Sequence, residues 1–294
     1  MSSILDLVGN TPLVEIKHLN PNPNVKLFGK LEGQNIGGSV KDRPAANMIK
    51  KAMERGELKP GMKLVEATSG NTGIALAMIA SALDIEIELI MPEHATAERI
   101  KTMQAYGAKV ILTPSSASME GAIDLAREKA ATGEYLMLNQ FGNEDNFMAH
   151  YHSTGPEIWK DTQGKVTHFV SAMGTTGTIM GVSKYLKEQN ENIQIVGTQP
   201  TEGSRIPGIR RWPKEYLPTI FDPTRVDRII DVSQEDATTM AKQLAKEESI
   251  FSGMSSGGAA IAALQLAREI EEGVIVFIVC DRGDRYLSSS LFEK

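Results

Sequence analysis

Lys41 is the side chain in this sequence with the clearest capacity for covalent chemistry. It follows a flexible loop that contains Gly37 and Gly38, and it precedes Pro44, which opens an amphipathic, helix-like stretch. The N-terminal end of a helix disfavours a nearby positive charge, so a lysine amine placed there is more available at neutral pH. Lysines of this kind form Schiff bases with carbonyl compounds. Most lysines beside loops are only solvated, so the rest of the sequence must decide between the two interpretations.

A polar turn follows the predicted strand 63–67 and leads into an apolar, helix-like stretch. It is built of small polar residues, namely Thr68, Ser69, Gly70, Asn71 and Thr72. Such a turn presents backbone N–H groups, hydroxyls and a side-chain amide to an anion at a helix N-terminus. An ordinary N-cap explains one hydroxyl but not this density of polar groups. The turn therefore predicts an anion site, and a carboxylate is its natural ligand.

A second turn of this kind follows the predicted strand 167–171. Its residues are Gly174, Thr175, Thr176, Gly177 and Thr178, which offer several backbone donors and three hydroxyls but no lysine. This composition suits a phosphate that stays bound rather than one that is transferred with magnesium. The Walker pattern is absent, and so is the G-x-G-x-x-G pattern, which removes the main support for a nicotinamide or flavin enzyme.

A third turn, residues 253–258, contains the G-x-S-x-G pattern around Ser255, which is typical of the nucleophile of α/β-hydrolases. In that fold the histidine of the catalytic triad follows the serine along the chain. All the histidines of this sequence precede Ser255; they are His18, His94, His150, His152 and His168. The order of these residues therefore argues against a serine hydrolase.

An activated lysine, two anion-binding turns and a serine turn together suggest pyridoxal phosphate, with its phosphate in one turn and a substrate carboxylate in the other. In this order and spacing the four motifs resemble the β-family of pyridoxal-phosphate enzymes (fold type II), and within it the cysteine synthases. Segments 10–13 and 155–158 match too, so the resemblance covers essentially the whole chain. Segments 209–213 and 280–286 narrow it to the B-type cysteine synthases.

The resemblance implies a β-replacement. Lys41 would hold pyridoxal phosphate as a Schiff base and, once displaced by O-acetyl-L-serine, would remove the α-proton of that substrate. Acetate would leave, and sulfide would add to give L-cysteine; thiosulfate as the alternative donor would give S-sulfocysteine. The alternatives are an O-phosphoserine sulfhydrylase, a cystathionine β-synthase-like enzyme, and, in another class, a cofactor-binding regulator without catalytic activity.

The resemblance also assigns individual residues. Asn71 would bond to the ring hydroxyl oxygen, and Ser255 would face the pyridine nitrogen. The cofactor phosphate would be held by Gly174, Thr175, Thr176, Gly177 and Thr178. The substrate would be bound by Thr68, Ser69, Asn71, Thr72 and Gln140, with Arg210 and Arg211 available for the oxyanions of thiosulfate. No role follows for Cys280, and no metal site is expected, because His150 and His152 lack partners at ligand spacing.

The elements that must position these residues alternate between strand-like and helix-like segments, which indicates α/β structure with parallel sheets covered by helices. The predicted strands are 63–67, 85–91, 108–112, 167–171, 193–199 and 274–280. The predicted helices are 43–55, 72–83, 96–106, 119–131, 176–188, 236–248 and 257–268. The proline-rich segment 202–225 is the clearest irregular stretch, and a loop of this length is more often functional than accidental.

The resemblance implies two lobes, each a mostly parallel twisted sheet, with the active site in the cleft between them, as in tryptophan synthase β. Residues 1–11 and 36–143 would form the N-terminal lobe, with Lys41 and the carboxylate turn. Residues 12–35 and 144–294 would form the C-terminal lobe, with the phosphate turn and Ser255.

Composition limits the partners and the location. The 294 residues carry 31 Lys and Arg and 37 Asp and Glu, a formal net charge of −6, which argues against nucleic-acid or membrane-surface binding. A signal peptide and an apolar run of membrane-spanning length are both absent, so we expect a cytoplasmic protein. The single cysteine, Cys280, rules out an internal disulfide. We expect a homodimer; serine acetyltransferase is a conceivable partner that the sequence does not support.

Overall fold

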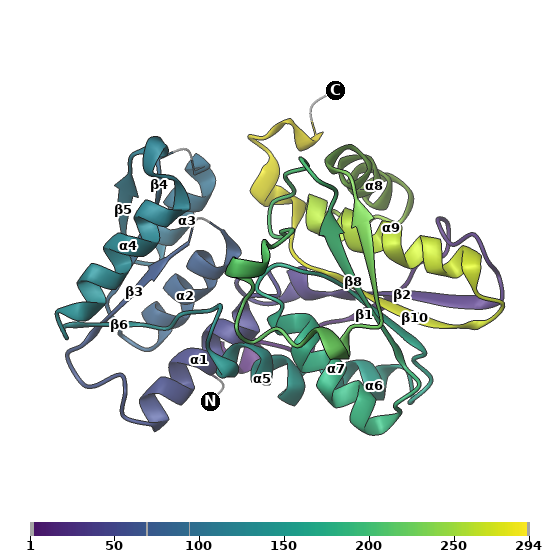
Figure 1. Cartoon of the computed structure of the whole chain (residues 1–294), viewed down its shortest axis with the longest axis horizontal. Helices are drawn as coiled ribbons and strands as arrows, with labels where there is room; N and C mark the ends of the chain where they lie inside the picture. The colour runs from purple at the N-terminus through teal and green to yellow at the C-terminus, as the bar shows by residue number, and fades with distance from the viewer. Residues whose placement is uncertain (1–2, 69, 94, 293–294) are drawn as a thin grey trace.

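Two β-sheets organise the chain, one in each lobe (Figure 1). The computed structural model describes residues 3–68, 70–93 and 95–292. The larger sheet contains, in spatial order, β1 (Leu13–Glu15), β2 (Val25–Leu31), β10 (Gly273–Val279), β7 (His168–Ala172), β8 (Gln194–Pro200) and β9 (Arg228–Val232). The smaller sheet contains β5 (Lys109–Thr113), β4 (Ile87–Pro92), β3 (Lys63–Ala67) and β6 (Tyr135–Met137). Every strand pair is parallel except β1 with β2. The predicted two-lobed α/β fold is confirmed.

Helices cover both faces of each sheet (Figure 1). In the smaller lobe, α1 (Asp42–Glu54), α2 (Asn71–Ala82) and α3 (Ala97–Ala105) lie on one face, and α4 (Ser118–Ala131) lies on the other. In the larger lobe, α8 (Gln234–Glu247) and α9 (Met254–Glu269) oppose α6 (Thr154–Asp161) and α7 (Gly177–Gln189). Helix α5 (Glu144–His152) packs against both α7 and α1, so it connects the two lobes.

The apolar strands are buried on both faces. In β10, Ile275 and Phe277 pack into the core under α8 and α9, whereas the alternating Val276 and Ile278 pack into the core under α6 and α7. Successive side chains of a strand point to opposite faces, so a strand covered on both sides is apolar throughout. This is why the sequence gives such clear signals for the central strands.

The predicted strands and helices are all present, with small shifts at their ends, but several elements were not predicted. Strands β1, β2, β6 and β9 and helices α5 and α6 gave no recognised signal. β1 and β6 are only three residues long, and Lys26 and Lys30 interrupt the apolar pattern of β2. Helix α9 begins at Met254, earlier than expected, because its first turn contains serines and glycines of low helix propensity.

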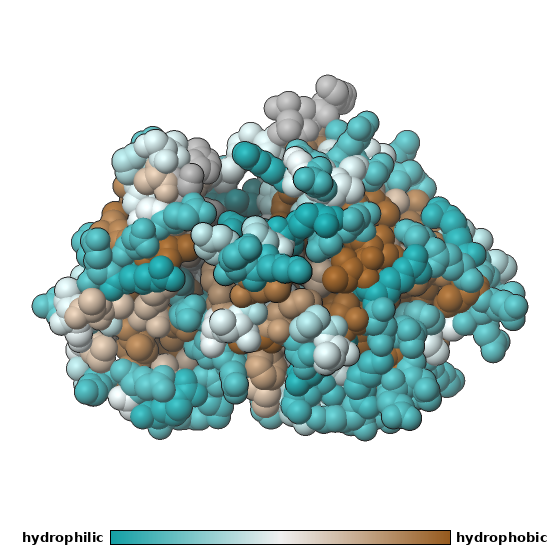
Figure 2. Space-filling view, viewed as in Figure 1, coloured by the Kyte–Doolittle hydropathy of each residue, from teal (hydrophilic) through white to brown (hydrophobic). Residues whose placement is uncertain are grey.

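Segment 202–225 forms an extended loop in which the only regular structure is two 3-10 helices, Lys214–Tyr216 and Pro223–Arg225. The surface is hollowed between the two lobes on the face shown in Figure 2. Within the described ranges, no helix has the length and hydropathy needed to cross a bilayer. The lobe boundaries given above stay a prediction, although β1 and β2 do pair within the larger sheet.

Candidate active site

Lys41 directly precedes α1, so its amine stands at the N-terminal end of that helix. Its backbone N–H donates to Ser39 Oγ over 3.2 Å, and a backbone bridge joins Ser39 to Asp281, just beyond β10. Burial lowers the pKa of Lys41 below its ordinary value, although the nearby charges of Asp281 and Glu32 oppose this effect. A lysine with a lowered pKa carries more of the neutral amine, the form that acts as nucleophile and base.

The polar turn after β3 contacts Gln140, which was predicted to bind the substrate together with this turn. Thr72 Oγ1 donates to Gln140 Oε1 over 2.9 Å, and both residues are buried. The Thr68 hydroxyl accepts a long hydrogen bond from the Gly70 N–H, at 3.4 Å. Ser69, also predicted to bind substrate, lies outside the described residues. The first N–H groups of α2 have no acceptor within the helix, so the turn can bind an anion.

Asn71, the first residue of α2, is held from two sides by the segment that follows β10. Its Nδ2 donates to Asp281 Oδ2 over 2.7 Å, and its Oδ1 accepts from the Arg285 guanidinium. The Tyr286 hydroxyl donates to the same Asp281 oxygen over 2.6 Å. In the sequence, this segment stood out only as a family signature. Charged residues directly after a buried apolar strand were a signal that could have placed them at the site.

The second anion turn forms the N-terminal end of α7. Thr176 has a left-handed backbone (φ 68°), and Gly177 begins the helix. A Cβ atom at Gly177 would lie 2.0 Å from Asn146 Oδ1, and one at Gly174 would lie 2.4 Å from the Gly208 carbonyl oxygen, so both positions require glycine. The Thr176 hydroxyl is buried and has no hydrogen-bond partner in the described part of the chain. A buried hydroxyl without a partner costs free energy that an anionic ligand can recover, which fits a phosphate at this turn.

Helix α5 connects the two anion turns. Asn146 Nδ2 donates to the backbone oxygen of Gln140 over 2.6 Å and to Thr175 Oγ1 over 3.2 Å. His150 Nε2 lies 3.3 Å from Thr178 Oγ1, and its Nδ1 lies 2.8 Å from Thr154 Oγ1. Burial, assisted by the nearby cationic side chains, lowers the pKa of His150 well below its usual value. A neutral imidazole therefore supports the phosphate turn, and neither Asn146 nor His150 was predicted as part of the site.

Ser255 lies in the first turn of α9 and is buried. It approaches Gly208 of the long loop, where an added Cβ would come within 3.6 Å of its hydroxyl oxygen. Burial, followed by the charge of Asp281, raises the pKa of the Cys280 thiol to about 11, while Lys41 and a hydrogen bond from Ser255 oppose the rise. The thiol is therefore neutral at pH 7, and a neutral thiol is a poor nucleophile.

The long loop covers the phosphate turn, but its two arginines differ in their surroundings. The Arg210 N–H donates to the Met173 carbonyl over 3.0 Å, and Trp212 Nε1 donates to the Gly174 carbonyl over 2.8 Å. The Arg210 guanidinium lies over the Trp212 ring, 5.2 Å from its centroid. Arg211 instead donates to the Pro200 carbonyl over 2.9 Å and pairs with Asp231 on β9. Arg211 is therefore already bound to protein groups.

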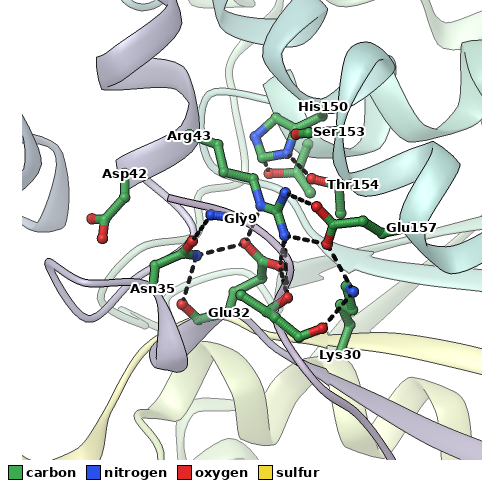
Figure 3. Close-up of polar contacts among 12 residues, drawn as sticks. Gly9, Lys30, Glu32, Asn35, Asp42, Arg43, His150, Ser153, Thr154 and Glu157 are labelled. Carbon is green, nitrogen blue, oxygen red and sulfur yellow. Dashed lines mark hydrogen bonds and ion pairs between the residues drawn. The ribbon is translucent and has the colours of Figure 1, made fainter. Parts of the chain in front are cut away.

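A buried ion cluster supports α1 immediately beyond Lys41 (Figure 3). We call Lys30, Glu32, Arg43 and Glu157 the Arg43 cluster. Arg43 pairs with Glu32 at 2.7 Å and with Glu157 at 2.6 Å, and the fully buried Lys30 pairs with Glu157 at 2.8 Å. Burial opposes the charge on Glu157, but hydrogen bonds and attraction from Arg43 and Lys30 outweigh it and lower its pKa to about 2. The cluster fixes the start of α1 against β2 and α6.

Asp42, the residue that follows Lys41 in the chain, stands apart from this cluster (Figure 3). Its Oδ2 accepts from the Gly37 N–H over 2.6 Å, whereas its Oδ1 is buried and unpaired among the described residues. Burial raises the pKa of Asp42 to about 7, against the hydrogen bond from Gly37 and the charge of Arg285. The carboxyl therefore titrates near neutral pH.

Comparison with known proteins gives one consistent result. The family model described as pyridoxal-phosphate dependent enzyme matches residues 4–281. The chain is 59% identical to cysteine synthase B of Pseudomonas aeruginosa over 291 residues, covering 99% of this chain and 97% of that protein. It is 54% identical to cysteine synthase B of Escherichia coli over 292 residues, covering 99% and 96%. Among solved structures, cysteine synthase of Entamoeba histolytica superposes with a TM-score of 0.94 at 40% identity, covering 100% of this chain and 91% of that one.

Proposed function

The chain belongs to the pyridoxal-phosphate-dependent enzymes and, among them, to the cysteine synthases, and on this premise we propose that it makes L-cysteine and acetate from O-acetyl-L-serine and sulfide. One observation carries the proposal: the chain combines a lysine of lowered pKa with two polar helix N-termini that Asn146 of α5 connects. These three features match the needs of pyridoxal phosphate and its amino-acid substrate. The cofactor needs an anchor for its aldehyde and a site for its phosphate, and the substrate needs a site for its carboxylate.

We infer the roles of the cofactor-binding residues from their surroundings. Pyridoxal phosphate, when bound, supplies the electron sink that makes the α-proton of an amino acid acidic. Lys41 Nζ would bind its aldehyde covalently. The first N–H groups of α7 and the unpaired Thr176 hydroxyl would hold its phosphate. The Asn71 amide would donate to its ring oxygen, and Ser255 would meet its ring nitrogen with a neutral hydroxyl.

The substrate roles follow from the first turn and from the state of the lysine. Thr68, Ser69, Thr72 and Gln140 would bind the carboxylate of O-acetyl-L-serine and so direct its α-carbon toward Lys41. The neutral Lys41 amine would then accept the α-proton, because its lowered pKa leaves it free of a proton more often than an ordinary lysine. The acetate oxygen would leave the β-carbon with the bonding electrons, sulfide would bond to the same carbon, and Lys41 would return the proton to the α-carbon.

We also propose that thiosulfate serves as a second sulfur donor and gives S-sulfocysteine. The surroundings of the two arginines support Arg210 as the residue that meets the extra oxyanions, because Asp231 already holds Arg211. We expect Arg210→Ala to lower turnover with thiosulfate about tenfold relative to turnover with sulfide. Arg211→Ala should change this ratio less. Equal ratios in the wild type and both variants would contradict the thiosulfate assignment.

The reaction itself is tested by measuring L-cysteine formed from O-acetyl-L-serine and sulfide, with Lys41→Ala as the inactive control. In further assays O-phosphoserine replaces O-acetyl-L-serine, and homocysteine replaces sulfide. Faster turnover with O-phosphoserine would favour an O-phosphoserine sulfhydrylase, and faster turnover with homocysteine would favour a cystathionine β-synthase-like enzyme. A protein that binds the cofactor but turns over none of these substrates would favour the regulator.

We propose that the working form is a cytoplasmic homodimer, as the family resemblance implies. Sedimentation equilibrium of the purified protein tests the assembly: a mass twice that of the 32.0 kDa chain is expected, and the mass of one chain would contradict it.

A further inference from the structure

Asp281 is a buried carboxylate to which three separate parts of the site attach. It is 1% exposed. Its Oδ2 accepts from Asn71 Nδ2 over 2.7 Å and from the Tyr286 hydroxyl over 2.6 Å, and its Oδ1 accepts from the Gly253 N–H over 3.3 Å. Its backbone bridges to Ser39, two residues before Lys41. Asp281 therefore touches the lysine loop, the start of α2 and the residue that precedes α9.

The Asn71 amide lies between the carboxylate of Asp281 and the guanidinium of Arg285, and these two neighbours fix its orientation. A carboxylate only accepts hydrogen bonds, and a guanidinium only donates them. Asn71 places its nitrogen against Asp281 and its oxygen against Arg285. The reverse orientation would set an oxygen against a carboxylate and an NH₂ group against a guanidinium. Both hydrogen bonds would be lost, so only one orientation of the amide is stable.

This orientation leaves one N–H of Asn71 unused. The NH₂ group carries two hydrogens. Asp281 accepts one of them, and no acceptor for the other lies within the described residues. Asn71 opens α2 and directly precedes Thr72, which contacts Gln140 at the carboxylate turn. The unused donor is therefore available to an acceptor oxygen of a ligand.

We propose that Asp281 is a positioning residue of this site, which turns the Asn71 amide so that its nitrogen, and not its oxygen, faces the ring hydroxyl oxygen of pyridoxal phosphate. The inference rests on the proposed function, because that oxygen belongs to the cofactor. Asp281 itself does not contact the reacting atoms. Without its carboxylate, the Asn71 amide could turn its oxygen toward the cofactor oxygen and lose the hydrogen bond.

The simpler view is that Asp281 only stabilises the fold through Tyr286 and Gly253. A swapped pair separates the two views. Asp281→Asn alone replaces a group that only accepts hydrogen bonds with an amide that can accept or donate, so the orientation of Asn71 is no longer fixed from this side. Asn71→Asp combined with Asp281→Asn restores a hydrogen bond between the two positions in the reverse direction, but the carboxylate introduced at position 71 has no N–H to give the cofactor. Asp284→Asn is the matched control, because Asp284 is an exposed carboxylate of the same segment and, among the described residues, pairs only with Arg282.

Three quantities are measured for each protein: the melting temperature, the visible absorbance of the bound cofactor without substrate, and the apparent dissociation constant of pyridoxal phosphate titrated into cofactor-free protein. We expect Asp281→Asn to weaken cofactor binding about tenfold and to change the absorbance spectrum. The swapped pair should regain the melting temperature of the wild type but neither its affinity nor its spectrum. Asp284→Asn should match the wild type in all three.

The inference is overturned if Asp281→Asn keeps the wild-type affinity and spectrum, or if the swapped pair regains both. Should Asp281→Asn alone fail to fold, the swapped pair carries the test by the same criterion. A wild-type protein that does not bind pyridoxal phosphate at all would overturn the proposed function as well. Suppose instead that the wild type binds pyridoxal phosphate and responds to O-acetyl-L-serine, while Asp281→Asn has the same affinity and spectrum as the wild type. That result would overturn this inference and leave the proposed function intact.

Discussion

Two buried polar regions meet at the start of α1, and they differ in how their groups are satisfied. In the Arg43 cluster each charge faces an opposite one: Arg43 pairs with Glu32 and Glu157, and Lys30 pairs with Glu157. In the candidate active site, the Thr176 hydroxyl and Asp42 Oδ1 have no partner among the described residues, and burial lowers the pKa of Lys41.

This difference distinguishes groups that hold the fold from groups prepared for a ligand. Buried polar groups in native proteins are nearly always paired, so a buried group left unpaired beside a candidate site is available to a ligand. Loss of a group from the paired region should therefore reduce stability. Loss of a group from the unpaired region should reduce cofactor binding or turnover without lowering stability at neutral pH.

The largest effect is expected at Lys41. Lys41→Ala and Lys41→Arg should each lower cysteine formation by about 1,000-fold or more, because a guanidinium neither binds an aldehyde as the amine does nor gives up its proton near pH 7. The melting temperature of the cofactor-free variants should stay close to that of the wild type. Substantial turnover by Lys41→Arg would show that charge, and not the amine, is what the site requires.

The next largest effect is expected in the Arg43 cluster. Arg43→Met would leave Glu32, which is fully buried, without its cationic partner, and we expect the free energy of unfolding to fall by about 3–5 kcal/mol. Lys51→Met is the control near the other end of the same helix, because the side chains of Lys51 and of its ion-pair partner Glu54 are 41% and 45% exposed. Urea unfolding of both variants measures the difference. Equal stability losses would remove the distinction between the two regions.

Stability should also depend on pH with opposite signs in the two regions. The folded pKa of Asp42 is about 7, above its ordinary 3.8, so its stabilising contribution is full below pH 3.8 and is lost as the pH rises through about 7. The folded pKa of Glu157 is about 2, below its ordinary 4.5, so its contribution is full above pH 4.5 and is lost as the pH falls through about 2.

Two variants test these signs through the free energy of unfolding measured across pH. In the wild type, titration of Asp42 should lower the free energy of unfolding by at most about 4 kcal/mol between about pH 4 and pH 8, and in Asp42→Asn this decrease should be absent. Glu157→Gln should abolish the loss on acidification. If Asp42→Asn leaves the neutral part of the profile unchanged, Asp42 is paired in solution and belongs with the cluster.

The smallest effect is expected at the unpaired hydroxyl. Thr176→Val keeps the side-chain shape and removes a group that has no protein partner, so the cofactor-free protein should keep its stability while its affinity for pyridoxal phosphate falls about tenfold. In Thr162→Val, the control, a hydroxyl that donates to the Ile158 carbonyl over 2.7 Å is lost. That variant should lose about 1 kcal/mol of stability and no affinity. The reverse pattern would contradict the assignment of the phosphate turn.

The parts of the fold that sequence could predict are those whose signal is local. The central strands and the long helices carry an apolar period that can be recognised in isolation. Strand β2 could not be found in this way, because Lys30 looks like a surface residue. It is fully buried only because Glu157 and Asp161, distant in sequence, pair with it.

The same limit applies to the candidate site. Lys41 and the two turns are conspicuous because small polar residues gather next to them in sequence. Asn146, His150 and Asp281 join them only through the fold, as the Asn71–Asp281 contact shows, since it spans 210 positions. No pattern in the sequence distinguishes Arg210 from Arg211 either, because that difference depends on Asp231 of β9.

The most direct test of the account is the visible absorbance of the purified protein before and after O-acetyl-L-serine is added. We expect a visible absorbance band from cofactor bound to Lys41. This band should shift when O-acetyl-L-serine is added and should return to its first position when sulfide is added afterwards. In Lys41→Ala the shift driven by removal of the α-proton should not occur. An unchanged wild-type spectrum on adding O-acetyl-L-serine, or an intact shift in Lys41→Ala, would contradict the central claim that this lysine anchors the cofactor and moves the proton.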